Sequence, residues 1–186
     1  MKLHYGGKYK NPQDLKNDGI LPENAVIFRE PDMRLLSIIG NIGAIVVLAV
    51  LTAIVYLICK PDFRHFMNQN FTATLLFMAL LIPHEILHAL CFREDVYLYN
   101  GLSMGLLFIY GTESMSKARF IFMSLLPNLV LGVVPFVLFL VHPDWSFLGL
   151  LGAFCISGGF GDYILPSIAK HNTLCFAGCA AAAKAT

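Results

Sequence analysis

Two histidines and a glutamate lie close together inside an apolar segment of this chain. In "LIPHEILHAL" (residues 81–90), His84, Glu85 and His88 form an H-E-x-x-H pattern. If the segment is helical, residues four positions apart share a face, so the two imidazoles could bind one metal ion. The glutamate beside the first histidine could then reach a water molecule on that ion. The pattern is therefore typical of zinc hydrolases.

The same three residues also have a simpler interpretation, as a buried polar cluster that joins helices or as a proton relay. By residue frequencies the pattern arises by chance in roughly one of a few hundred chains of this length. A membrane helix loses free energy when it holds ionisable side chains near its middle, so chance matches there should be rarer. The position of the motif therefore favours a metal site.

A catalytic zinc ion needs a third protein ligand and an open fourth position. Asp162, in "SGGFGDYILP" (157–166), is the only acidic residue after Trp145. A lone carboxylate inside an apolar segment indicates a function, although a helix-end carboxylate that reaches toward the membrane surface is the alternative. The glycines before it would let neighbouring helices approach closely. Asp162 is our candidate for the third ligand.

Four apolar segments must position these residues. Hydrophobic residues make up 57% of the 186-residue chain and charged residues 13%, about half the charged fraction of a soluble domain. The segments are each long enough to cross a bilayer of about 30 Å, and they are Leu35–Cys59, Phe71–Phe92, about Phe120–Val141 and about Trp145–Ala169. We therefore expect an all-α, multi-pass membrane protein with four transmembrane helices.

The expected organisation is a polar N-terminal segment (1–34), a four-span membrane domain (35–169) with a metalloprotease-like core (71–169), and a C-terminal tail (170–186). Lysine and arginine are concentrated before the first span and in the loop 93–119. This distribution predicts that both termini and that loop lie in the cytoplasm. Net charge is +1, which gives no indication of nucleic-acid binding.

The candidate ligands can bind one metal ion only if they lie at the same depth in the membrane. The second and fourth segments run in the same direction across the bilayer. His84 lies eight residues before the end of its segment, and Asp162 lies seven before Ala169. At about 1.5 Å per residue, both side chains lie roughly 10–12 Å below the same boundary. The sequence therefore predicts that the carboxylate and the imidazoles meet.

Three further features of the sequence allow more than one interpretation. "VYLYNGLSMGLLFIY" (96–110) contains two β-rich runs, which predict a short β-hairpin or a re-entrant loop, with a strand-free surface loop as the alternative. Asn128, in "SLLPNLVLG" (124–132), could bind a substrate backbone or an oxyanion, and interhelical hydrogen bonding is the alternative. Cys175 and Cys179 could form a metal clip or a disulfide, but no second Cys/His pair accompanies them.

These motifs carry a resemblance to known families. An H-E-x-x-H helix, an intervening span and a later span with a Gly-Asp pair resemble the intramembrane metalloproteases of the site-2 protease type. More closely, "PHEILHALCF", the hydrophobic loop after it, "SLLPN" and "GDYI" resemble the small bacterial membrane proteins grouped as putative zincin peptidases. This resemblance extends over roughly Phe71 to Ile168.

The site-2 resemblance implies zinc bound by His84, His88 and Asp162, with Glu85 as general base, and cleavage of a peptide bond in or near the membrane. It also implies that a β element beside the site pairs with an extended substrate. The chain departs from the site-2 protease family in one respect: that family usually has Asn and Pro ahead of an Asp-Gly pair on the same helix. Here Tyr163 follows the aspartate, and Pro127-Asn128 lies on the preceding segment, so the departure affects the substrate-gripping residues more than the metal ligands.

We therefore expect a zinc metalloendopeptidase in a bacterial cell membrane, acting through a zinc-activated water and Glu85. Its expected partners are a membrane-embedded or membrane-proximal peptide and the lipid bilayer. The alternative is a non-catalytic metal-binding membrane protein or carrier that uses the same His/His/Asp site. A third interpretation is a degenerate relative that binds membrane helices without cutting them.

Overall fold

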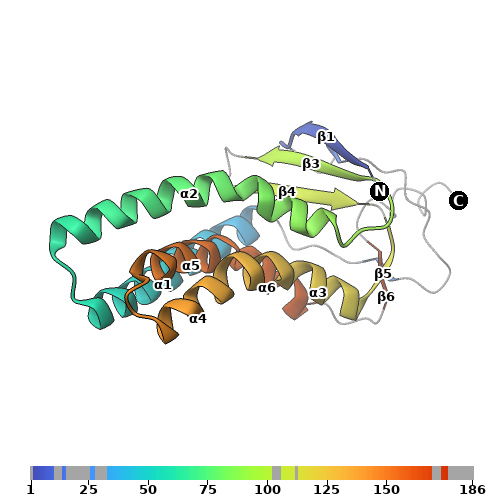
Figure 1. Cartoon of the computed structure of the whole chain (residues 1–186). Helices are drawn as coiled ribbons and strands as arrows, with labels where there is room; N and C mark the ends of the chain where they lie inside the picture. Colours follow the sequence, from blue (N-terminus) through green and yellow to red (C-terminus); the bar gives the residue numbers. More distant parts are fainter. Residues whose placement is uncertain are drawn as a thin grey trace, which may run out of the picture.

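Most of the chain is helical, and two small sheets lie at one end of the helices (Figure 1). The computed structural model describes residues 2–10, 14–15, 26–27, 33–101, 106–111, 113–168 and 173–175. The helices are α1 (Met33–Cys59), α2 (Phe63–Ala89), α3 (Lys117–Pro127), the π-helix η3 (Asn128–Val133), α4 (Val134–Val141), α5 (Ser146–Gly158) and α6 (Phe160–Ile168). The strands are β1 (Leu3–Lys8), β2 (Val26–Ile27), β3 (Val96–Gly101), β4 (Leu106–Gly111), β5 (Met115–Ser116) and β6 (Thr173–Cys175).

Three helical segments in the described residues are long and apolar enough to cross a membrane: Ser37–Cys59, Phe63–Ala89 and Lys117–Val141. They correspond to the first three predicted spans. The second begins at Phe63 rather than Phe71, because the more polar residues before Phe71 also continue the helix. Many large apolar side chains point outward along these helices. Such surfaces suit a lipid environment, where they need no covering.

The fourth predicted span is not one continuous helix, which corrects the expected count of four. It is divided into α5, with 13 residues, and α6, with 9 residues, and the two helices meet at Gly159. A Cβ atom at Gly159 would collide with the side chain of Asn128. Asn128 thus occupies the space beside the chain where the two helices meet, and only glycine leaves that space free.

The predicted hairpin is confirmed. Strands β3 and β4 pair antiparallel from Val96 opposite Gly111 to Gly101 opposite Leu106. Residues 102–105, which connect the strands, lie outside the described residues. The N-terminal segment, expected only to be polar, contributes β1, which pairs parallel with β3 in the sheet order β1-β3-β4. Just before β1, the backbone N–H of Lys2 donates a hydrogen bond to the side chain of Asp95 at 2.7 Å, which holds the start of the strand.

Two apolar cores lie along α2 on either side of the H-E-x-x-H motif. One core packs the sheet against the end of α2 and the start of α3, with Tyr99 and Phe120 fully buried. The other packs α1, α2, α4 and α5 together around Phe139 and Leu150. α2 contributes Ala73 to the second core and Ala89 to the first. The motif at residues 84–88 therefore lies between two packed regions that fix its helix.

A second three-stranded sheet has the order β2-β6-β5. β6 pairs parallel with β2 and antiparallel with β5. Cys175 is the last residue of β6. Cys179, most of the predicted C-terminal tail and the Ala-rich end lie outside the described residues, so the structure does not test whether the two cysteines form a clip or a disulfide.

Candidate metal centre

α2 brings the three motif residues into one cluster. His84, Glu85 and His88 each offer a ligand atom, and these atoms lie within 4.8 Å of one another. The two imidazole rings are 4.9 Å apart between centroids and nearly perpendicular, at 77°. Glu85 and His88 are only 7% and 8% exposed. The helical spacing predicted from the sequence thus places two imidazoles and a carboxylate in a shielded site.

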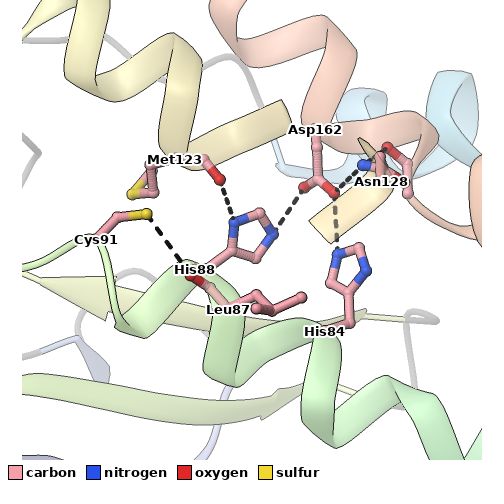
Figure 2. Close-up of polar contacts among 8 residues, drawn as sticks. His84, Leu87, His88, Cys91, Met123, Asn128 and Asp162 are labelled. Carbon is pink, nitrogen blue, oxygen red and sulfur yellow. Dashed lines mark hydrogen bonds and ion pairs between the residues drawn. The ribbon is translucent and has the colours of Figure 1, made fainter. Parts of the chain in front are cut away.

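Asp162 reaches this cluster from α6. Its Oδ2 atom lies 3.1 Å from Nε2 of His84, and its Oδ1 atom lies 3.5 Å from Nε2 of His88 (Figure 2). One carboxylate therefore contacts both imidazoles, although it is 78 residues from the first of them in sequence. The structure brings together the three residues that the sequence singled out as metal ligands.

A backbone carbonyl sets the orientation of His88. Nδ1 of His88 lies 2.9 Å from the carbonyl oxygen of Met123 on α3. A carbonyl can only accept, so Nδ1 carries a proton, and Nε2 is the ring nitrogen that faces Asp162. Metal-binding histidines characteristically donate their other ring N–H to such an acceptor. Because Met123 acts through its backbone, its side chain gave no signal in the sequence.

The donor set fits a zinc ion. Zinc takes imidazole nitrogen and carboxylate oxygen at about 2.0–2.2 Å in a tetrahedron, so two ligand atoms lie about 3.4 Å apart. The separations of 3.1 and 3.5 Å between Asp162 and the imidazole nitrogens are close to that value. Two imidazoles and one carboxylate also leave a fourth position open, as in catalytic zinc sites.

Glu85 lies beside these three residues and has one unused oxygen. The backbone of Ile109, on β4, hydrogen-bonds the carboxylate. The other oxygen, Oε2, is buried and has no hydrogen-bond partner in the part of the chain that the structure describes. A buried polar atom without a partner costs about 1–3 kcal/mol. This cost is removed when the site holds water or a polar ligand, so the arrangement fits a site that binds one.

Asn128 contacts the candidate ligand Asp162 rather than an open surface. Its Nδ2 donates to Oδ2 of Asp162 at 2.8 Å and to the carbonyl oxygen of Gly159 at 3.3 Å. The residue is 1% exposed and begins the π-helix η3, a type of helical turn often found at functional sites. Of the two roles weighed from the sequence, substrate contact and interhelical hydrogen bonding, the structure shows the second: the amide N–H of Asn128 faces the Asp162 carboxylate and orients it.

A second polar cluster, here called the Glu113 network, holds the end of α2. Nε and Nη2 of Arg119 donate to the carbonyl oxygen of Cys91 at 2.9 and 2.6 Å, and Nη1 donates to Glu113. The other oxygen of Glu113 accepts from the backbone N–H groups of Arg93 and Glu94 at 2.7 and 3.1 Å. Burial alone would raise the pKa of Glu113, but these donors outweigh it and lower the pKa below its ordinary value.

The Glu113 network was missed in the sequence, where Arg119 counted only as one positive charge of a loop. Its members come from the segment after α2, the segment before β5 and the start of α3. Arg119 lies four residues before Met123 on α3, whose carbonyl holds His88. The network therefore fixes the two elements that between them position His88.

The fold and the site together combine long apolar helices with an H-E-x-x-H motif on one helix and a carboxylate from a later helix. A family model described as "Putative zincin peptidase" matches residues 77–171, just over half of the chain. The chain belongs to this family. The matched segment contains His84, Glu85, His88 and Asp162, and the name of the family implies zinc and peptide hydrolysis. No curated protein and no solved structure was found to match.

Proposed function

We propose that this protein is an integral membrane zinc endopeptidase that hydrolyses peptide bonds in or near the bilayer. The observation that carries the proposal is the contact of one carboxylate, from Asp162, with Nε2 of both His84 and His88, beside the buried and unpartnered Oε2 of Glu85. Membership of the zincin family supports peptide hydrolysis. The three long apolar helices support a membrane location.

Three residues would hold the ion: His84 and His88 through Nε2, and Asp162 through its carboxylate. When bound, zinc supplies a Lewis acid for the attacking water and for the scissile carbonyl. Asn128 keeps the Asp162 carboxylate turned toward the imidazoles through its amide N–H. Met123 keeps the proton of His88 on Nδ1, so that Nε2 stays available.

Glu85 moves the proton. Its unpartnered Oε2 accepts a proton from the water as the water oxygen bonds to the scissile carbonyl carbon. Glu85 then gives that proton to the amide nitrogen as the C–N bond breaks, so the products are a free carboxylate end and a free amine. The hydrogen bond from the Ile109 backbone holds the carboxylate in place during both transfers.

The position of β4 supports an extended substrate. β4 is the last strand in the order β1-β3-β4 among the described residues, and its Ile109 backbone faces Glu85. A peptide paired with this edge would pass the general base with its carbonyls exposed, as in other proteins that bind peptides by strand addition. A helical substrate would have to unwind first, because a helix hydrogen-bonds its own carbonyls.

The orientation of the protein in the membrane is part of the proposal. The excess of lysine and arginine before α1 and in residues 93–119 supports cytoplasmic termini. Because the metal centre lies near the end of α2 that leads into residues 93–119, the site would open toward the cytoplasmic side. A bacterial cell membrane remains the location that the sequence resemblance supports.

Glu85→Gln provides the sharpest test. The purified protein is reconstituted in lipid vesicles with single-span model peptides, and zinc content and peptide cleavage are measured together. Glu85→Gln should keep the zinc content of the native protein and lose cleavage by at least 100-fold, since general base catalysis contributes about 10²–10⁴-fold. Cleavage by the variant at the native rate would refute the mechanism. A native protein that binds zinc but cuts no peptide would favour the carrier instead.

A further inference from the structure

A partly enclosed cavity of about 110 Å³ opens beside His84 and Glu85. Its walls come from α2, β4, η3 and α5, and most of them are apolar. Phe77 and Leu81 lie on the same helix as His84, while Leu107 and Leu131 face them from β4 and η3. The cavity therefore connects an apolar pocket directly to the proposed general base.

The polarity of the lining decides what the cavity holds. His84 and Glu85 lie at one end, and Cys155 adds only a weakly polar thiol. Phe77 is two helical turns before His84, so the apolar part extends about 10 Å along α2, away from the ionisable groups. A water molecule in that part would lack the two to four polar partners that buried waters need. An apolar side chain fits the lining better.

The far end of the cavity is tightly packed, which limits the size of the occupant. At Gly158 an added Cβ would lie 2.5 Å from the ring of Phe77, so the two elements are already in close contact there. The same ring stacks on Phe154, with centroids 6.0 Å apart. An engineered apolar cavity of about 150 Å³ holds benzene. A volume of about 110 Å³ therefore suits a branched aliphatic side chain and excludes an indole.

We propose that this cavity receives a leucine-sized aliphatic side chain of the substrate, at a residue that flanks the scissile bond. The inference rests on the proposed function, because Glu85 and His84 mark the reacting centre. The geometry of β4 agrees with it: Leu107 lines the cavity, and Ile109, two residues on along the same strand, faces Glu85. A peptide extended along β4 would thus place its carbonyl at Glu85 and a neighbouring side chain in the cavity.

The test uses three probes that share one metal-binding group and differ only in their side chains: alanine, leucine and tryptophan hydroxamates. Their binding to the full-length, zinc-loaded protein in detergent is measured by calorimetry, which requires no turnover. Leucine hydroxamate should bind about 10-fold more tightly than alanine hydroxamate or better, since even one methylene in an apolar pocket gives 10-fold discrimination. Tryptophan hydroxamate should bind no more tightly than the alanine compound.

Two substitutions in η3 form a matched pair. Leu131→Phe fills the cavity and should abolish the preference for leucine over alanine hydroxamate. Leu129→Phe, on the same π-helix but 50% exposed, should behave like the native protein. Leu131→Ala enlarges the cavity and should let tryptophan hydroxamate bind more tightly. Zinc content, measured on each variant, shows that the metal centre is intact.

Equal affinity of the native protein for all three probes would overturn the inference. So would a full leucine preference in zinc-containing Leu131→Phe. The peptidase proposal fails separately: a native protein that prefers leucine hydroxamate but cuts no peptide would leave the pocket assignment standing. Conversely, cleavage of model peptides with equal rates next to alanine, leucine and tryptophan would leave the peptidase standing and remove the pocket.

Discussion

Nδ2 of Asn128, a residue that is almost fully buried, lies 2.8 Å from Oδ2 of Asp162, which is 34 residues away in sequence. The same Oδ2 atom is the one that contacts His84. The amide therefore fixes the rotation of a carboxylate that has to serve both imidazoles at once. Partners of this kind, which touch a ligand rather than the metal, typically contribute 10–100-fold to metal affinity.

Asn128→Ala should accordingly weaken zinc binding by about 10–100-fold, without removing any of the three proposed ligands. Competition with a chromogenic chelator measures the change. Asn41→Ala is the control, because the Asn41 amide is exposed and donates within its own helix, to Ser37. Native zinc affinity in the Asn128 variant would show that Asp162 needs no such partner.

Gly159→Ala should disturb the junction of α5 and α6. The new Cβ would collide with Asn128, and crowding of a packed site typically costs about 1–3 kcal/mol. We expect a lower midpoint of thermal unfolding in detergent and weaker zinc binding, because Asp162 lies three residues further on. Gly161→Ala tests the specificity of this effect, since no described residue lies within 4 Å of a Cβ there. If both variants unfold at the native midpoint, the tight contact is not part of the fold.

Zinc content should follow the three proposed ligands. We expect about one zinc per chain in the native protein and loss of the ion in His88→Ala and Asp162→Ala, because two ligands alone leave the ion weakly held. His65→Ala, an exposed histidine on the same helix, should keep native content. Metal analysis of the purified proteins measures the zinc content of each variant. Full retention in Asp162→Ala would require another third ligand.

The Glu113 network should make stability depend on pH in the acidic range. The pKa of Glu113 is lowered in the folded protein, mainly by hydrogen bonds from Arg93, Glu94 and Arg119 that outweigh burial. The ionised carboxylate therefore stabilises the fold above its unfolded pKa of about 4.3, and the contribution disappears as pH falls through the lower folded pKa. Glu113→Gln should destabilise the protein near neutral pH by roughly 1.5–3 kcal/mol.

The difference between the native protein and Glu113→Gln should shrink as the pH falls below about 4. Thermal unfolding across this range measures it. Glu94→Gln serves as a control, because only its backbone N–H takes part in the network and its side chain is exposed. A constant difference between native and Glu113→Gln at every pH would mean that the charge of Glu113 contributes nothing.

The meeting of the candidate ligand side chains could be predicted from the sequence, largely because the expected spans constrain the depth of each residue. The ends of two apolar segments located His84 and Asp162 at one level, and the structure brings their side chains to 3.1 Å. The contacts of Met123 and Ile109 could not be found in this way. Both act through backbone atoms, which every residue type offers, so no side chain marks them in the sequence.

Other structural features that the sequence did not predict were missed for similar physical reasons. An apolar run with several glycines is compatible with one long helix or with two, and the collision between Asn128 and a side chain at Gly159 appears only when helices pack. The pairing of β1 with β3 joins residues more than 90 positions apart, and no local pattern specifies such a distant partner. The interhelical hydrogen bond of Asn128 was one of the roles weighed from the sequence, but its partner depends on the packing of two helices, which spacing alone does not give.

The N-terminal strand has a practical consequence for handling the protein. β1 is hydrogen-bonded to β3, β3 to β4, and the backbone of β4 to Glu85. Residues 3–8 are thus separated from the Glu85 carboxylate by only two neighbouring strands, although they lie about eighty positions away along the chain. Purification handles or reporter fusions joined at the amino end would therefore disturb β1 and, through β3 and β4, the strand that contacts Glu85.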